Sequence, residues 1–112
     1  MKELIIKELE YAKLIHLRWA ELPEEEQVFR GGSRLHKEVA IQKDIIINVL
    51  RGDRREIRRA GTLLFRWIER HEHWIIKVQK EPSWIKEAGD VGWHKRWIET
   101  YKNVLQEINR KE

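Results

Sequence analysis

Apolar residues recur every three or four positions in four long segments of the chain, which is the spacing of one helix face. In the clearest of these segments the apolar positions are Trp93, Trp97, Tyr101, Val104 and Ile108. The pattern predicts an all-α protein. We expect its four long helices over residues 3–21, 34–51, 54–80 and 91–110.

Proline and glycine residues separate these segments from one another. Pro23 ends the first helix, Gly52 the second, and Pro82 the third, because proline pushes the preceding residues out of the helical region and glycine suits the position after a helix. Two short helices are predicted over residues 23–30 and 83–88. In the first of these, Glu24, Glu25 and Glu26 stand at the positive end of the helix dipole.

Polar residues with short side chains precede the remaining helices. Ser33 and Asp90 are expected to cap the helices that follow them, since such side chains accept hydrogen bonds from unpaired backbone N–H groups. Asp53 and Glu56 have the spacing of a capping box, in which Asp53 accepts from the N–H of Glu56 and the Glu56 side chain reaches back.

The four apolar faces predict the core of a single domain over residues 1–112. Short links between long helices favour an antiparallel, up-down four-helix bundle with one or two short accessory helical turns. Besides the face of helix 91–110, the expected core residues are Ile5, Leu9, Ala12, Ile15 and Trp19; Leu35, Val39, Ile46, Val49 and Leu50; and Ile57, Leu64, Trp67, Ile68, Ile75 and Val78.

Composition narrows the class of protein further. No apolar stretch exceeds three residues, as in Ile45 to Ile47, whereas a membrane-spanning helix needs roughly 20. The chain starts with charged residues and has no signal-peptide pattern, so we expect a cytoplasmic protein. The absence of cysteine excludes thiol catalysis and thiolate zinc sites.

The net charge of +4 is concentrated in one part of the chain. Residues 1–50 have eight Lys and Arg against nine Asp and Glu, and residues 81–112 have six against six. Residues 51–80 have nine against four, and seven of those nine are arginine, which makes bidentate contacts with phosphate or carboxylate. The whole excess therefore belongs to the third helix and its first turn.

Several of these cations form a stripe along one side of the third helix. Arg55, Arg59, Arg66, Arg70 and Lys77 fall in one arc at about 100° per residue, opposite the apolar face. Arginines near a helix N-terminus and like-charge pairs four residues apart are unfavourable by a few tenths of a kcal/mol each, up to about 1 kcal/mol. A solvated helix face is the structural alternative, but these energies favour a binding role. The predicted anion-binding residues are Arg54, Arg55, Arg58, Arg59, Arg66, Arg70 and Lys77.

The six tryptophans divide into core and surface candidates. Four of them, Trp19, Trp67, Trp93 and Trp97, lie on core faces at helical spacing. Trp74 lies at the edge of its face one turn after Arg70, so its ring can stack on that guanidinium. Trp84 in the short link is the other candidate for exposure.

Five histidines are the only catalytic or metal-binding candidates. None has a glutamate three residues before it, so the metal-ligand spacing of helical bundles is missing and no metal or other cofactor is expected. His16 and His71 lie within apolar faces, where a hydrogen-bonded core or boundary histidine is the expected role.

The segment from Arg66 to His71 resembles the arginine, four residues, histidine motif of HEPN-domain ribonucleases, which are small helical bundles that dimerise. The resemblance covers six residues, and Trp67 stands where the family often has a polar residue. It implies metal-independent RNA cleavage, with Arg66 and His71 contributed to a cleft between two chains.

Three functions follow in order of support. The first is a non-enzymatic protein whose arginine stripe binds RNA or DNA backbone. The second is a protein-interaction or homo-oligomeric adaptor or inhibitor, in which the stripe meets an acidic surface such as the glutamate cluster of another copy, and Ile41 and Ile45 add an apolar patch. The third is the ribonuclease.

Overall fold

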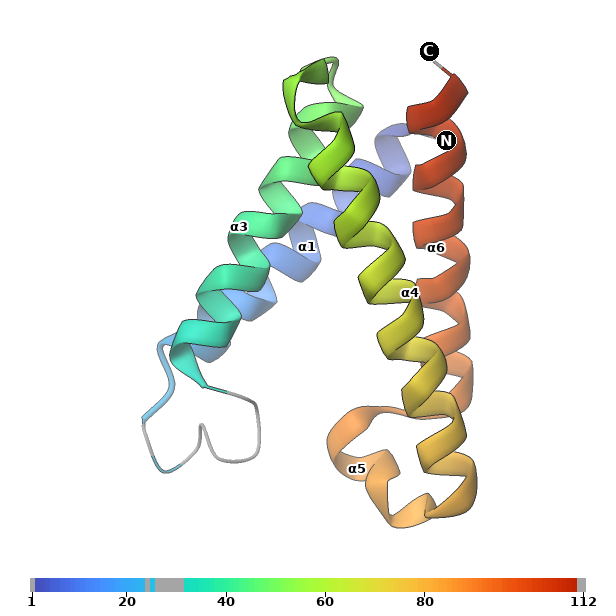
Figure 1. Ribbon diagram of the computed structural model, residues 1–112. Helices are drawn as coiled ribbons and strands as arrows, with labels where there is room; N and C mark the ends of the chain where they lie inside the picture. The colour runs from blue at the N-terminus through green and yellow to red at the C-terminus, as the bar shows by residue number, and fades with distance from the viewer. Residues whose placement is uncertain (1, 24, 26–31, 111–112) are drawn as a thin grey trace. The chain divides into compact units, whose positions relative to one another are not determined.

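The computed structural model describes residues 2–23, 25 and 32–110, and all regular structure in this part of the chain is helical (Figure 1). The long helices are α1 (Lys2–Ala20), α3 (Ser33–Leu50), α4 (Ile57–Lys80) and α6 (Val91–Arg110). The short ones are the 3₁₀ turns η1 (Arg54–Glu56) and η2 (Pro82–Trp84), and α5 (Ile85–Ala88). The all-α prediction is confirmed, and the long helices agree with the predicted ranges to within three residues. Most of the predicted helix over residues 23–30, with Glu24 and Glu26, lies outside the described residues.

Contacts along the chain divide it into two compact units, Met1–Ala60 and Gly61–Glu112. The first unit contains α1 and α3, and the second contains most of α4 together with α6. No described helix combines the length and the apolar character that crossing a bilayer requires.

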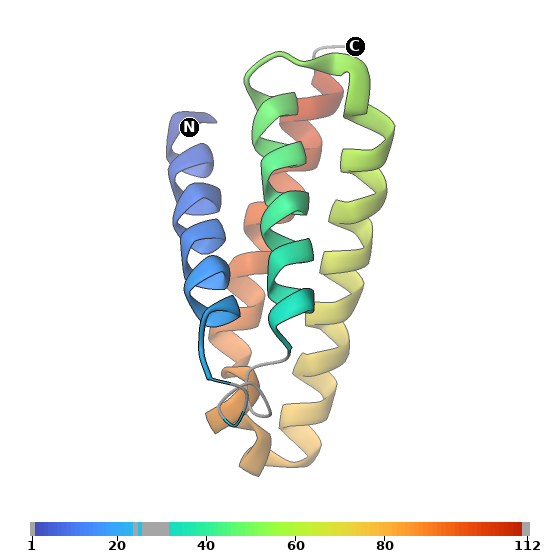
Figure 2. The same ribbon diagram turned by 90° about the vertical axis from the view of Figure 1, so that its left-hand side faces the viewer.

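In the first unit, α1 and α3 pack against each other as an antiparallel hairpin (Figure 2). Polar pairs follow one another along it, from Glu10 with Arg51, through Lys13 with Asp44, to the hydroxyl of Ser33, which donates to the carbonyl of Ala20 over 2.8 Å. Buried residues of this unit include Ile5, Ile6, Leu9, Ala12, Ala40, Ile46, Ile47, Val49 and Leu50.

Three details of the first unit differ from the prediction. Leu35 is 44% exposed, because the buried face of α3 is turned toward His36 and Lys43. Ser33 does not cap α3, since its hydroxyl instead satisfies a carbonyl at the end of α1. The Asp53 carboxylate accepts a hydrogen bond from the N–H of Arg55 rather than from that of Glu56. The residues after Asp53 form the 3₁₀ turn η1 before α4 begins.

In the second unit, α4 and α6 form another antiparallel hairpin, with ring contacts between Trp67 and Tyr101 and between His71 and His94. The reversal contains η2, α5 and Gly89, whose φ of 90° is in the left-handed region. A side chain at Gly89 would also collide with the Trp93 ring, at 2.7 Å.

Two predictions about α6 have different outcomes. The Asp90 cap is confirmed, because its Oδ1 accepts from the N–H of Trp93 over 2.7 Å. Trp93 itself is 40% exposed, whereas the neighbouring His94 is buried, so the buried face lies to one side of the predicted one. Buried residues of this unit are Leu63, Leu64, Trp67, Ile68, Val78, His94, Ile98, Tyr101, Val104 and Ile108.

Candidate polyanion-binding surface

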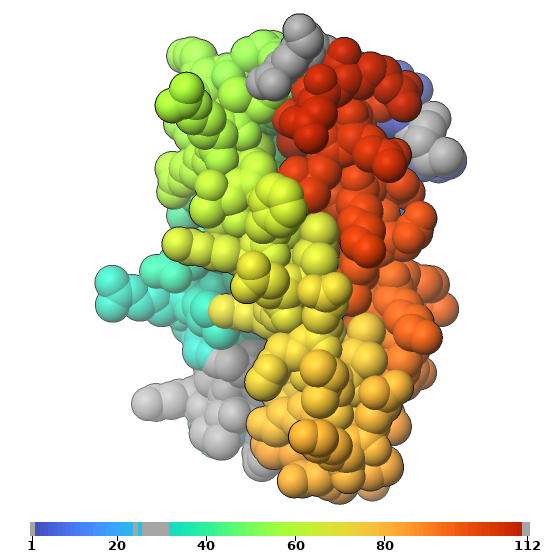
Figure 3. All heavy atoms as spheres, turned by 45° about the vertical axis from the view of Figure 1, so that its right-hand side comes forward, coloured from blue at the N-terminus to red at the C-terminus, as the bar shows by residue number. Residues whose placement is uncertain are grey.

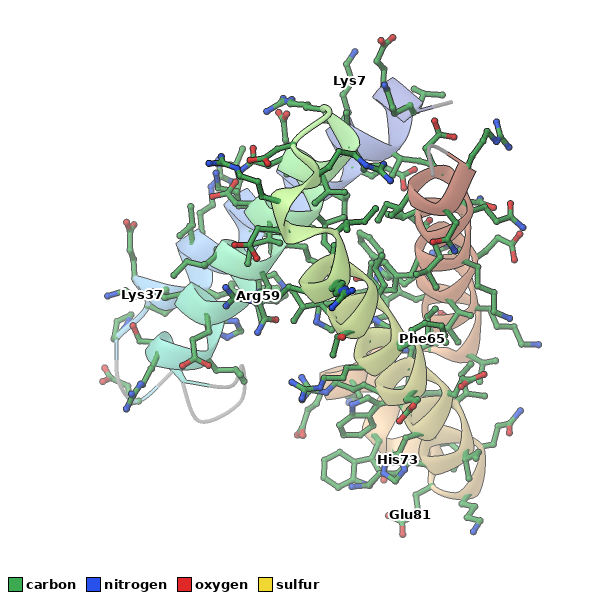
Figure 4. The ribbon with its side chains drawn as sticks, turned by 45° about the horizontal axis from the view of Figure 1, so that its top comes forward. Lys7, Lys37, Arg59, Phe65, His73 and Glu81 are labelled. Carbon is green, nitrogen blue, oxygen red and sulfur yellow. The ribbon has the colours of Figure 1, made fainter. Side chains whose placement is uncertain are left out.

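Four cations follow one line along α4, which we call the cationic line: Arg59, Arg66, Arg70 and Lys77. At about 100° and 1.5 Å per residue they stay within an arc of about 40° and span about 27 Å of the helix. The three arginines are exposed, and Lys77 is half-buried. Figure 3 shows α4, from green to yellow, at the surface with side chains standing out from it, and Figure 4 labels Arg59 near its first turn.

The arginines of the cationic line have no acidic partner in the described part of the chain. No ion pair is formed there by Arg59, Arg66 or Arg70. Elsewhere in the chain, Arg51 pairs with Glu10 and Lys13 pairs with Asp44 across a helix contact. The charges of Arg59, Arg66 and Arg70 are thus left available to an external anion.

The predicted anion-binding residues near the start of α4 differ from the cationic line, because they have interactions within the protein. Arg55 is held by Asp53 through two side-chain hydrogen bonds of 2.9 and 2.8 Å. These bonds lower the pKa of Asp53 to about 2 and raise the pKa of Arg55. Arg58 is exposed and Arg54 is half-buried, and both have interactions of their own. Of the seven predicted residues, Arg55 is therefore neutralised locally.

The C-terminal end of the cationic line meets two tryptophans, which we call the tryptophan pair: Trp74 of α4 and Trp84 of η2. The two ring centroids are 5.8 Å apart, with an angle of 59° between the planes. The ammonium of Lys77 lies over both rings, 4.9 Å from the Trp74 centroid and 4.2 Å from that of Trp84. Trp84 also donates its indole N–H to Glu81 over 3.0 Å. The cation on Trp74 is therefore Lys77, not Arg70 as predicted.

Each unit also contains a pair of histidines joined at their Nδ1 atoms. The distance is 3.0 Å between His16 and His36 and 2.7 Å between His71 and His94. One ring of each pair must donate and the other accept, so the two rings have different tautomers. Hydrogen-bonded roles for His16 and His71 are confirmed.

The partners His36 and His94 were missed by sequence reasoning. Both are buried, at 4% and 1% exposure. For the first pair the signal was available in the spacing, because His16 lies four residues before the end of α1 and His36 three residues after the start of α3. An antiparallel hairpin brings such positions face to face.

A buried lysine distinguishes the surroundings of the first histidine pair. Burial lowers the pKa of Lys43 to about 7. Burial, then the charge of Lys43, then His36, lower the pKa of His16 to about 4. In the second pair, burial lowers the pKa of His94 against the opposing effects of the Ala88 and Gly89 carbonyls and of Asp90. Burial thus favours the neutral form of both His16 and His94.

Arg66 and His71, the pair carried by the ribonuclease resemblance, have different surroundings. Arg66 is exposed, whereas His71 is half-buried with its Nδ1 against His94 and its ring against Trp93 and Tyr101. Catalysis by this pair stays a prediction. Within the described residues, no group of three or more histidine and carboxylate side chains is arranged to hold a metal ion.

No family model matches the sequence, and neither the curated proteins nor the solved structures include a significant match.

Proposed function

We propose that this protein is a non-enzymatic nucleic-acid-binding protein that contacts the phosphate backbone of RNA or DNA through α4. The observation that supports this proposal is the cationic line, in which exposed arginines without acidic partners among the described residues follow one side of a single helix. A regularly charged polymer fits such a line better than a small anion does, because several charges are met at once.

The physical basis is the release of counterions from the polyanion. Each phosphate neutralised by an arginine frees condensed ions, so binding weakens steeply as salt rises. Arginine also binds a phosphate through two parallel N–H groups, which gives each contact a defined geometry. The proposal therefore predicts a salt-dependent affinity with little preference for base sequence.

The test compares two double charge reversals that change the net charge equally. Arg66→Glu/Arg70→Glu alters the cationic line, and Lys7→Glu/Lys37→Glu alters exposed lysines of α1 and α3 (Figure 4). We expect the first variant to bind fluorescent oligonucleotides at least about tenfold more weakly and to lose about 1.4 to 1.8 from the slope of log affinity against log salt. The second variant should stay within about threefold of the unaltered protein.

Equal losses in both variants would contradict the role of α4, and absence of binding at low salt would contradict the function itself. Circular dichroism checks that both variants remain helical. The RNA probe is also examined for cleavage after incubation without divalent metal. Cleavage that disappears in His71→Ala would support the ribonuclease alternative instead.

A protein partner is the second candidate, favoured by exposed apolar side chains. Ile41 on α3 is 59% exposed and Phe65 on α4 is 60% exposed. An acidic protein surface or a second copy of the chain is the proposed partner in that case. Sedimentation over a wide concentration range tests the homodimer, and a constant monomer would contradict it.

The remaining proposals concern architecture and location. We propose that the two hairpins belong to one antiparallel four-helix bundle, because four long helices with apolar faces are joined by short links. A cytoplasmic location is proposed because it agrees with a nucleic-acid partner.

A further inference from the structure

We propose that the nucleic acid bound by this protein is single-stranded, and that its bases stack on the tryptophan pair, Trp74 and Trp84. This inference rests on the proposed function and adds the class of nucleic acid and the residues that recognise it. Aromatic side chains among cations bind single strands because every unpaired base has a flat face to stack.

The exposure of the tryptophan pair distinguishes it from the two buried aromatic rings of its unit, Trp67 and Tyr101. Trp67 and Tyr101 are buried, at 8% and 3% exposure, and their rings pack against each other between α4 and α6. Trp74 and Trp84 are both half-buried, and their neighbours Pro82, Ser83 and Ile85 are exposed. Part of each indole therefore faces solvent, where an external base can reach it.

The tryptophan pair continues the cationic line without a break. Trp74 follows Arg70 by one helical turn, about 6 Å along the axis and about 40° around it. Lys77 belongs to both features, because it is the last cation of the line and its ammonium lies over both indole rings. A strand whose phosphates follow Arg66 and Arg70 would thus bring its bases to the rings.

The rings are already held in place before any ligand binds. The indole N–H of Trp84 is bonded to Glu81, and the Lys77 ammonium restrains the ring faces. Figure 4 labels His73, which directly precedes Trp74 in the sequence, and Glu81, both at this end of α4. Because the aromatic surface is preorganised, a stacking base loses less of its binding free energy to ordering the protein.

The same geometry disfavours a duplex as the ligand. In a double helix the base faces are covered by stacking on their neighbours, and only edges and phosphates are accessible. A duplex would contact the cationic line alone. The protein should therefore bind single strands more tightly than duplexes of equal length, and the difference should depend on the two tryptophans.

The experiment measures fluorescence anisotropy of labelled oligothymidine and of a duplex of equal length, with variants Trp74→Leu and Trp84→Leu. We expect each variant to bind the single strand about tenfold more weakly and the duplex within about twofold of the unaltered protein. Trp84→Phe should retain most of the affinity, since it keeps a stacking ring while losing the bond to Glu81. Phe65→Leu, which removes an exposed aromatic ring elsewhere on α4, is the matched control and should leave both affinities unchanged.

A second measurement uses the unaltered protein and so does not depend on the folding of a variant. A single strand containing 5-bromouracil is crosslinked by light, and the attached residues are mapped by mass spectrometry. Crosslinks at Trp74 or Trp84 are expected, and crosslinks confined to other aromatic residues would overturn the inference.

Different results would contradict the stacking of bases and the binding of the nucleic-acid backbone. If both probes bind with dependence on Arg66 and Arg70 but the tryptophan variants bind like Phe65→Leu, stacking is wrong and backbone binding stands. If neither probe binds at low salt, both proposals are wrong.

Discussion

The two hairpins of this protein are built on the same plan but held together by different interactions. Both contain an antiparallel helix pair with two histidines joined at Nδ1. In the first hairpin, ion pairs connect the helices, as between Lys13 and Asp44 at 2.8 Å. In the second, aromatic rings pack between the helices, as for Trp67 and Tyr101. Ring contacts of this kind therefore join α4 to α6.

Net charge does not distinguish the two regions, but the placement of charge does. Residues 1–60 have 13 Lys and Arg against 11 Asp and Glu, and residues 61–112 have 10 against eight, so each unit has a net charge of +2. In the first unit the exposed lysines Lys7 and Lys37 belong to different helices. In α4, Arg66 and Arg70 stand one turn apart on one line. Alignment along a helix, rather than the amount of charge, is what makes α4 the candidate surface.

The largest effect is expected from cavities in the two hydrophobic cores. Leu9 in α1 and Leu64 in α4 are both fully buried, so Leu9→Ala and Leu64→Ala should each lower the free energy of unfolding by about 2–5 kcal/mol. Urea unfolding followed by circular dichroism measures this loss. A change below about 1 kcal/mol in either variant would contradict the assigned core.

The same experiment tests whether the two hairpins unfold together. Trp19 is the only tryptophan of the first unit, whereas the second has five, so tryptophan fluorescence reports mainly on the second. If the hairpins form one bundle, Leu9→Ala should shift the fluorescence and dichroism transitions equally. A dichroism transition that shifts without the fluorescence transition would contradict the bundle.

A smaller effect, confined to the first hairpin, is expected from its buried lysine. The pKa of Lys43 is about 7 in the folded chain against a usual 10.5, so the unfolded chain binds more protons between these pH values. Stability should therefore rise as the pH increases from about 7 to 10.5. Lys43→Met should remove this rise and should raise stability at pH 6 by about 1–4 kcal/mol.

His16 provides an internal check on Lys43→Met. Its folded pKa of about 4 is below the usual 6.5, so stability should fall as the pH drops through that interval. Loss of the neighbouring charge in Lys43→Met should raise the pKa of His16 in an NMR titration. An unchanged His16 titration would show that Lys43 does not influence the pair.

The smallest effect is expected for the hydrogen bond of a histidine pair. A double-mutant cycle with His71→Leu and His94→Leu should give a coupling energy of about 0.5–1.5 kcal/mol. The equivalent cycle with His16→Leu and His36→Leu is the comparison in the first hairpin. Coupling near zero in both cycles would mean that the Nδ1 contacts do not stabilise the hairpins.

Features that depend on neighbouring residues were predictable from the sequence. The bounds of α6, the Asp90 cap and the positive φ of Gly52, at 115°, follow from helical periodicity and local backbone preferences. The cationic line was predictable for the same reason, because residues on one helix keep fixed angular relations whatever the helix packs against. The exposure of Arg59, Arg66 and Arg70 agrees with that prediction.

Features that join distant residues were decided by the packing of one helix on another. The rotation of α3 about its axis, which exposes Leu35 and buries His36 and Lys43, depends on the surface against which the helix packs. Apolar and polar residues are mixed on this face, so a rotation by one residue position changes the match to helical periodicity very little. The tryptophan pair likewise exists only because η2 folds Trp84 back toward α4. Local spacing thus determined the helices and the line of charge, and long-range contacts determined which histidines pair and where two indole rings meet.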